Sequence, residues 1–240
     1  MAGIEYAIEQ SPGLLKSSRR GGTTGAVLWK VTLVVAEWLA SRDNALWNIG
    51  VLARDTTMLE LGCGVAGLVG LAVGPLIAKY VLTDQDYVMK KLHRNLELNQ
   101  GKPSSQKPVA RQRIKQSPED TRGCSNLQTL CLDWEHDSVQ NLQHVLGGNQ
   151  GIDIVLLCDC VYNDFLIAPL AQTCVEICSL STSRQMILLI AQQLRSDEVF
   201  EVWIATLLAR FRVFRLNDEH LPVDLQTTSG YYIYLALLRT

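Results

Sequence analysis

No excess of charge of either sign marks this chain of 240 residues, and charged side chains are few. It has 22 basic and 24 acidic residues, a formal net charge of -2, and a composition that is 19% charged and 48% hydrophobic. The near balance excludes a generally basic nucleic-acid-binding protein, although a local basic patch is compatible with it. The apolar content excludes disorder for most of the chain, and the length favours a single domain.

The sequence also lacks an uninterrupted apolar run that could cross a membrane. Residues 61–78 contain no charged side chain, which approaches the length of about 18 residues that a membrane helix needs. Five glycines and a proline interrupt this stretch and indicate a turn that leads into a buried helix. Residues 1–20 contain two glutamates and a proline where a secretory signal would have an apolar core, so we expect no signal peptide.

Cysteines at zinc-ligand spacing are absent as well. The seven cysteines are scattered, and the two close pairs, Cys158/Cys160 and Cys174/Cys178, have neither a second pair nor a nearby histidine. We therefore expect no metal site. Free buried thiols are the better interpretation, and they are typical of the cytoplasm, with the nucleus as a second compartment.

The order of apolar and polar residues predicts alternating strands and helices. Apolar runs of strand length recur, and most are followed by apolar residues at helical spacing, whereas the last two strands have no helix between them. This order predicts an α/β fold with a mostly parallel sheet and one antiparallel strand. The predicted strands are residues 58–61, 80–84, 127–134, 152–159, 186–191, 211–216 and 231–238; the predicted helices are residues 31–40, a segment from the glycines to about residue 79, and residues 87–99, 165–179 and 197–210.

A basic loop at residues 100–126 has no apolar periodicity. It contains six basic residues and two acidic ones, a net charge of +4, together with several prolines and serines. A loop of this length inside a compact domain is either a solvated insertion or a functional segment. A contact surface for an acidic partner or for ribosomal RNA is the functional interpretation, and both remain open.

A glycine-rich turn is predicted between the first strand and the helix after it. Gly62, Gly64 and Gly67 satisfy the pattern G-x-G-x-x-G, which lets the backbone approach a ligand beside the free N–H groups of a helix start. Asp84 ends the next predicted strand, where a carboxylate can accept both ribose hydroxyls of a nucleoside. These two features fit a dinucleotide and an adenosyl cofactor equally well.

Further polar and aromatic residues favour the adenosyl cofactor. Glu60 places a carboxylate where it could meet a cationic amino-acid group and would repel a pyrophosphate. Trp134 offers an aromatic face for adenine after the third strand, with Asp133 as an acceptor nearby. Asp159 and Tyr162 follow the fourth strand. Since ligands of open α/β sheets bind along the carboxyl ends of the strands, we expect these residues to converge on one crevice.

Five short motifs occur in an order that resembles the seven-strand protein-lysine methyltransferases known as methyltransferase family 16. The motifs are Gly25-x-x-x-Trp29, Glu60-x-Gly62-x-Gly64, Thr83-Asp84, Leu132-Asp133-Trp134 and Asp159-x-x-Tyr162. The resemblance extends from about Gly22 to the C-terminus. Residues 21–29, 80–89, 158–178 and 191–196 resemble in particular the fungal ribosomal lysine methyltransferase 5 branch.

The resemblance implies a class I methyltransferase fold, a doubly wound seven-strand sheet of order 3-2-1-4-5-7-6. It implies an N-terminal segment at residues 1–21, a single methyltransferase domain at residues 22–240, and S-adenosyl-L-methionine as the cofactor. The implied cofactor-binding residues are Trp29, Glu60, Gly62, Gly64, Asp84, Trp134 and Cys158; the implied catalytic residues, which frame the entry of the target lysine, are Asp159 and Tyr162.

The resemblance also implies the reaction and its partners. A protein-lysine N-methyltransferase acting on a large-subunit ribosomal protein is the leading expectation, as a cytoplasmic monomer without membrane attachment. A translation elongation factor or a chaperone is the alternative substrate. The basic loop is longer than the corresponding turn in most relatives, so substrate identity does not transfer simply.

The charges suggest how such an enzyme would work. A lysine amine has a pKa of about 10.4, so it is protonated at neutral pH and lacks the lone pair that attacks a methyl group. The positive sulfur of the cofactor and removal from water both lower that pKa, whereas a nearby carboxylate raises it. We expect Asp159 to align the amine for in-line displacement, with the proton lost to water, and Tyr162 to wall the channel.

Three rival functions fit parts of the sequence. An NAD-dependent oxidoreductase would suit the glycines and Asp84, but the chain has no Tyr-x-x-x-Lys pair. A nucleic-acid amino methyltransferase would have an Asn-Pro-Pro-Tyr type of sequence where this chain has residues 159–162, Asp-Cys-Val-Tyr. A non-catalytic partner protein is the third rival, although every expected cofactor residue is present.

Overall fold

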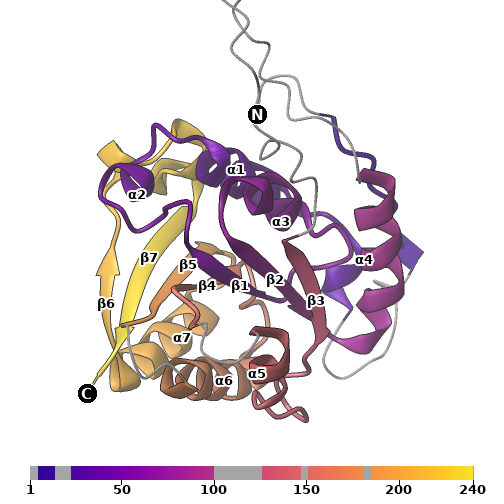
Figure 1. The fold of residues 1–240 in the computed structure, drawn as a ribbon. Coiled ribbons are helices and arrows are strands. Elements are labelled where there is room, and N and C mark those ends of the chain that lie inside the picture. Colours follow the sequence, from indigo (N-terminus) through magenta and orange to yellow (C-terminus); the bar gives the residue numbers. More distant parts are fainter. Residues whose placement is uncertain (1–4, 14–22, 100–125, 147–150, 181–184, 240) are drawn as a thin grey trace, which may run out of the picture.

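A seven-stranded sheet forms the centre of the computed structural model, which describes residues 5–13, 23–99, 126–146, 151–180 and 185–239 (Figure 1). The strands are β1 (Thr57–Leu61), β2 (Lys79–Asp84), β3 (Leu127–Cys131), β4 (Ile154–Cys158), β5 (Ile187–Gln193), β6 (Phe211–Arg215) and β7 (Tyr231–Leu238). Their order is β3-β2-β1-β4-β5-β7-β6, and β7 alone runs antiparallel to its neighbours. This order and the single antiparallel strand confirm the predicted fold class.

Helices cover both faces of the sheet, and each face has its own apolar cluster. The helices are α1 (Lys30–Ala40), α2 (Ala45–Asn48), α3 (Leu68–Val73), α4 (Asp86–Asn99), α5 (Asn141–Leu146), α6 (Ile167–Leu180) and α7 (Asp197–Arg210). Apolar residues of α1, α3 and α4 pack on one face, and those of α5, α6 and α7 pack on the other (Figure 1). The strands β1 and β4 are buried along their whole length, which explains their nearly continuous apolar sequences.

Several element boundaries differ from the predictions. The helix after the glycines ends at Val73, not near residue 79, because Pro75 lies in the short 3-10 turn that follows it, Gly74–Leu76. Strand β3 ends at Cys131, so Trp134 lies in the turn beyond the strand. Of the predicted basic loop at residues 100–126, only Asn126 falls within the described residues.

An N-terminal strap, residues 5–13, is attached to α4 by two asparagines. The side-chain amide of Asn99 pairs with the N–H and C=O of Ala7 at 2.9 Å each, and Asn95 pairs likewise with Glu9 at 2.7 and 2.9 Å. Asparagines four apart on a helix thus match backbone groups two apart on an extended segment. The Asn95 amide also donates to the carbonyl of Val65, 2.7 Å away in the glycine-rich turn, so the strap and the turn share one anchor.

Replacing Asn95 with alanine is expected to lower the free energy of unfolding by about 3 kcal/mol. Asn95 is fully buried, and its loss leaves the Val65 carbonyl and both backbone groups of Glu9 without these partners, each at a cost of about 1–3 kcal/mol where water cannot replace them. Urea unfolding at pH 7 measures the difference. Asn217→Ala, at an exposed position, is the control and should change stability by less than about 0.5 kcal/mol. An equal change in both variants would contradict the anchoring role.

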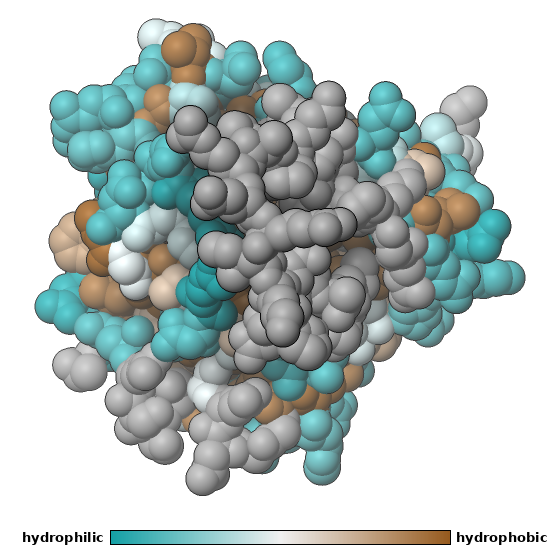
Figure 2. Space-filling model, turned by 45° about the horizontal axis from the view of Figure 1, so that its top comes forward, coloured by the Kyte–Doolittle hydropathy of each residue, from teal (hydrophilic) through white to brown (hydrophobic). Residues whose placement is uncertain are grey.

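The coloured part of the surface in Figure 2 is mostly polar. None of the helices in the described ranges has the length and apolar character needed to span a bilayer. Figure 2 shows hydrophilic residues over much of one face, with smaller apolar areas between them. Most large apolar side chains are in the two buried clusters. Polar and aromatic side chains line a pocket at the carboxyl edge of the sheet.

Candidate functional site

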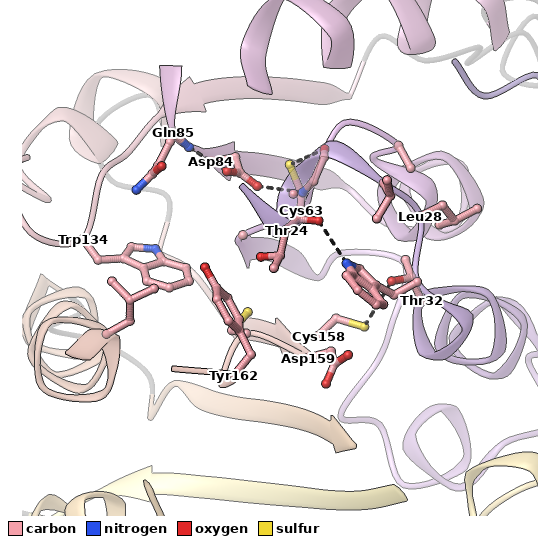
Figure 3. Close-up of a pocket in the computed structure, with 18 of the residues that line it drawn as sticks. Thr24, Leu28, Thr32, Cys63, Asp84, Gln85, Trp134, Cys158, Asp159 and Tyr162 are labelled. Carbon is pink, nitrogen blue, oxygen red and sulfur yellow. Dashed lines mark hydrogen bonds between the residues drawn. The ribbon is translucent and has the colours of Figure 1, made fainter. Parts of the chain in front are cut away.

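A pocket lies at the carboxyl ends of β1, β2 and β4. Its lining includes eight of the nine site residues predicted from the sequence: Trp29, Gly62, Gly64, Asp84, Trp134, Cys158, Asp159 and Tyr162. Figure 3 shows Trp134 and Tyr162 on one side of the pocket and Leu28 and Thr32 on the other, with Asp84 and Asp159 at opposite margins. Residues more than 100 positions apart in sequence therefore meet in one crevice, as expected for this sheet topology.

The glycine-rich turn forms the floor of the pocket. Gly62 and Gly64 have positive φ angles of 69° and 65°, which L side chains rarely adopt. A β-carbon at Gly62 would lie 3.1 Å from the Trp134 ring, and one at Gly64 would lie 3.3 Å from the carbonyl oxygen of Gly25. The same carbonyl accepts the N–H of Val65 at 2.8 Å. The turn is thus fixed against the segment before α1, with its backbone open toward the pocket.

Asp84 is buried at the end of β2 and holds the turn from the other side. Its Oδ2 accepts the N–H of Gly64 at 2.7 Å, and its Oδ1 accepts the N–H of Gln85 at 2.7 Å. Burial raises the pKa of Asp84 to about 6, and these two hydrogen bonds oppose the rise. Each carboxylate oxygen keeps a further acceptor site, so the side chain can still receive two hydroxyl groups from a ligand.

Two tryptophans contribute aromatic surface to the pocket. The Nε1 of Trp134 is buried and has no hydrogen-bond partner among the described residues. The indole N–H of Trp29 donates to the carbonyl of Thr24 at 3.0 Å, which fixes the ring just before α1 begins at Lys30. Asp133, which precedes Trp134, is not in the lining, and its Oδ1 accepts the N–H of Glu135 at 2.9 Å. The Asp133 side chain therefore bonds within its own turn, and Trp134 lines the pocket.

Glu60 is the one predicted site residue that is not in the pocket lining. Its side chain is 1% exposed, and its Oε2 accepts the Tyr80 hydroxyl at 2.7 Å. Burial raises the pKa of Glu60 to about 7, against the lowering effect of the Tyr80 hydrogen bond, and the charge of Asp84 adds to the rise. The side chain of Glu60 therefore links β1 to β2, and its contact with a cofactor stays a prediction.

Replacing Glu60 with glutamine is expected to stabilise the protein at pH 8. In the unfolded chain the carboxyl ionises near pH 4.5, whereas in the fold it stays protonated up to about pH 7. Between these values the folded state binds more protons, so the wild type loses up to about 3 kcal/mol as the pH rises, and glutamine avoids that loss. Urea unfolding at pH 4 and pH 8 should show no difference at the first and higher stability of Glu60→Gln at the second. A less stable variant at pH 8 would show that the ionised carboxylate has a partner of its own.

Asp159 occupies the most constrained backbone position of the site. It is the one residue other than glycine with a positive φ, 59°, in the described part of the chain. Its N–H donates to the carbonyl of Ala191 at 2.7 Å, across from the end of β5. The carboxylate forms a two-pronged ion pair with Arg195, in which Nη1 lies 2.7 Å from Oδ1 and Nη2 contacts Oδ2.

Tyr162 and the pocket thiols remain protonated at neutral pH. Burial raises the pKa of Tyr162, although its hydrogen bond with Thr24 opposes the rise. Burial also raises the pKa values of Cys158 and Cys160 well above the ordinary value of a thiol. These groups can wall the pocket and donate hydrogen bonds, but they are not poised as bases or nucleophiles.

Sequence reasoning missed two residues that surround Asp159. Gln192 donates through Nε2 to Asp159 at 3.2 Å and to the Val161 carbonyl at 2.7 Å, and it is 3% exposed. Arg195 supplies the ion pair and lies over the Trp29 ring at 5.5 Å. Both lie in residues 191–196, a stretch that marked the resemblance, yet no spacing rule connects them to a strand end 33 or more residues earlier.

Comparisons with known proteins agree with this architecture. A family model described as lysine methyltransferase matches residues 9–116 and 120–207. A ribosomal lysine N-methyltransferase 5 of Zygosaccharomyces rouxii is 28% identical over 249 residues, which cover 95% of this chain and 78% of that protein. A diaminohydroxyphosphoribosylamino-pyrimidine deaminase of Schizosaccharomyces pombe is 29% identical over 214 residues, 89% of this chain but only 44% of that longer protein.

A solved structure supports the fold independently. The methyltransferase domain of a bacterial CtHen1 protein superposes with a TM-score of 0.51 at 12% identity, over 87% of this chain and all of that domain. Such low identity is evidence for the fold alone, which is that of class I methyltransferases. The match of the family model over most of the sequence goes further: the chain belongs to the lysine methyltransferase family, whose class I enzymes take the methyl group from S-adenosylmethionine.

Proposed function

We propose that this chain is a protein-lysine N-methyltransferase whose substrate is a large-subunit ribosomal protein. The observation that carries the proposal is the meeting of a nucleoside-type cradle, Gly62, Gly64 and Asp84, with Asp159 and Tyr162 in one pocket. The names of several relatives, ribosomal lysine N-methyltransferase 5, support the choice of substrate. The proposed catalytic unit is residues 22–240, acting as a cytoplasmic monomer.

The pocket residues fit S-adenosylmethionine better than a dinucleotide. Asp84 and Asp159 are the charged residues of the lining, and the described lining includes no lysine, arginine or histidine to neutralise a pyrophosphate. The Nε1 of Trp134 is a buried donor without a protein partner, and a bound ligand could satisfy it. We propose that Trp29, Gly62, Gly64, Asp84, Trp134 and Cys158 hold the cofactor.

The cofactor supplies a methyl group on a positively charged sulfur, already activated for transfer to a neutral amine. The chain's own task is to hold the target lysine in line and without its proton. Asp159 accepts an N–H of the amine and orients it. Tyr162, whose hydroxyl stays protonated, cannot remove a proton from the amine. It walls the channel, and the amine loses its proton to water.

Titration calorimetry and methyl transfer test the proposal together. S-adenosylhomocysteine should bind in the micromolar range and NAD should not. Radiolabelled methyl groups should then pass to a protein of unmethylated large ribosomal subunits. Labelling of an elongation factor or a chaperone instead would change the substrate and keep the activity. Binding of NAD, or of neither compound, would overturn the proposal.

A further inference from the structure

We infer that Arg195 is a positioning residue, which keeps the entrance of the pocket electrically neutral so that Asp159 can orient the target amine without favouring its protonated form. The inference rests on the proposed function. Arg195 is not in the pocket lining, but it contacts Asp159, which is.

The ion pair fixes the carboxylate in two ways. Both guanidinium prongs of Arg195 reach Asp159, which is the strongest arrangement of these two groups and also defines the plane of the carboxylate. The guanidinium in turn lies 5.5 Å from the centre of the Trp29 ring, which provides an attractive face for a cation. Arg195 therefore connects Asp159, just after the end of β4, to Trp29, just before the start of α1.

The hydrogen bonds leave one oxygen of Asp159 available to a substrate. Oδ1 receives three donors: Arg195 at 2.7 Å, the Gln192 amide at 3.2 Å and the Gln193 N–H at 3.3 Å. Among the described residues, Arg195 is the one donor to Oδ2. Since a carboxylate oxygen has two acceptor sites, Oδ2 can take an N–H of the incoming amine while the ion pair remains intact.

The net charge around this oxygen is set by the pair itself. Among the described residues, Tyr231, Cys158 and Cys160 also interact with Asp159, and burial raises the pKa of each, so all three are neutral at pH 7. The negative charge of Asp159 and the positive charge of Arg195 thus cancel. An unpaired carboxylate would attract an ammonium group and stabilise its proton, which would leave the lysine unable to attack.

Two analogues of S-adenosylhomocysteine test this inference without knowledge of the protein substrate. In both, an alkyl arm extends from the position of the transferred methyl group, and it ends in a primary amine in one and in a hydroxyl in the other. Calorimetry at pH 7 gives the affinity ratio of the charged to the uncharged arm. Arg195→Gln and Arg195→Met should each raise this ratio about tenfold, because the ammonium then faces an uncompensated carboxylate. Arg195→Lys should keep the wild-type ratio.

The controls separate the inference from a structural effect. Arg212→Gln, an exposed arginine on the edge strand β6, should leave the ratio unchanged. In turnover, Arg195→Gln should shift the half-maximal kcat to higher pH, whereas a structural defect would lower kcat equally at every pH. An unchanged ratio in both the Gln and Met variants, with the hydroxyl analogue still bound, would overturn the inference. Binding of neither analogue by the wild type would overturn the proposed function and the inference with it.

Discussion

Replacing Asp84 with alanine is expected to weaken S-adenosylhomocysteine binding at least 100-fold. The proposed contacts are two ribose hydroxyls, and a hydrogen bond to a charged group contributes about 1.5–3 kcal/mol, so the loss of two gives 3 kcal/mol or more. The substitution also removes the acceptor for the Gly64 N–H, which loosens the glycine-rich turn. Titration calorimetry at pH 7.5 measures the effect.

The pH dependence of S-adenosylhomocysteine affinity provides a second test of Asp84. Burial raises the pKa of Asp84 to about 6, so in the wild type the affinity should fall as the pH drops below 6 and the carboxylate gains a proton. Asp84→Asn should bind weakly at all pH values and lack this dependence. Asp86→Ala, at the exposed start of α4, is the matched control and should bind normally. Affinity within fivefold of the wild type in Asp84→Ala would refute the assignment.

Asp159→Asn is expected to reduce methyl transfer about 100-fold, because the target amine loses the group that orients it for in-line displacement. An amide keeps the size of the side chain but replaces one acceptor oxygen with an NH₂ donor, so it cannot keep the two-pronged pair with Arg195 that fixes the orienting group. Binding of S-adenosylhomocysteine should change by less than about threefold, because the proposed cofactor contacts lie elsewhere. Single-turnover methylation with radiolabelled cofactor measures the rate.

The neighbouring carboxylate Asp164 is the matched control for this substitution. It lies exposed in the 3-10 turn Asp164–Leu166, close to the site in sequence but outside the pocket lining. Asp164→Asn should retain the native rate. A native rate in Asp159→Asn as well would remove Asp159 from the mechanism and leave positioning to Tyr162 and Trp29.

The fold was predictable because its strongest signals are local. Buried parallel strands such as β4 are continuous apolar runs, and the alternation with helices specifies the sheet class. The strand order itself came from the family resemblance, since periodicity does not encode neighbours. Boundaries were less accurate where backbone chemistry overrides apolar pattern, as at Pro75, which ends the helix before its apolar sequence does.

The residues of the pocket lining that lie at strand ends were predictable from the sequence. Residues that reach the pocket only by contacting one of these side chains were missed. Asp84 and Asp159 follow apolar strands, and the topology alone brings them to one edge. Glu60 is next to the glycines in sequence, but the pleat turns its side chain toward Tyr80, and position along the chain could not reveal that direction. Arg195 reaches Asp159 over a sequence separation of 36, a contact that only the folded backbone defines.

The left-handed backbone conformation of Asp159 lowers the stability of the fold at a position that carries a proposed catalytic side chain. An L side chain in this conformation costs roughly 1 kcal/mol relative to glycine, which adopts it freely. Glycine at position 159 would avoid this cost but would leave Arg195 and the Gln192 amide without the carboxylate that they contact. Engineering that raises the melting temperature of this enzyme should leave residue 159 fixed and seek its gains away from the pocket.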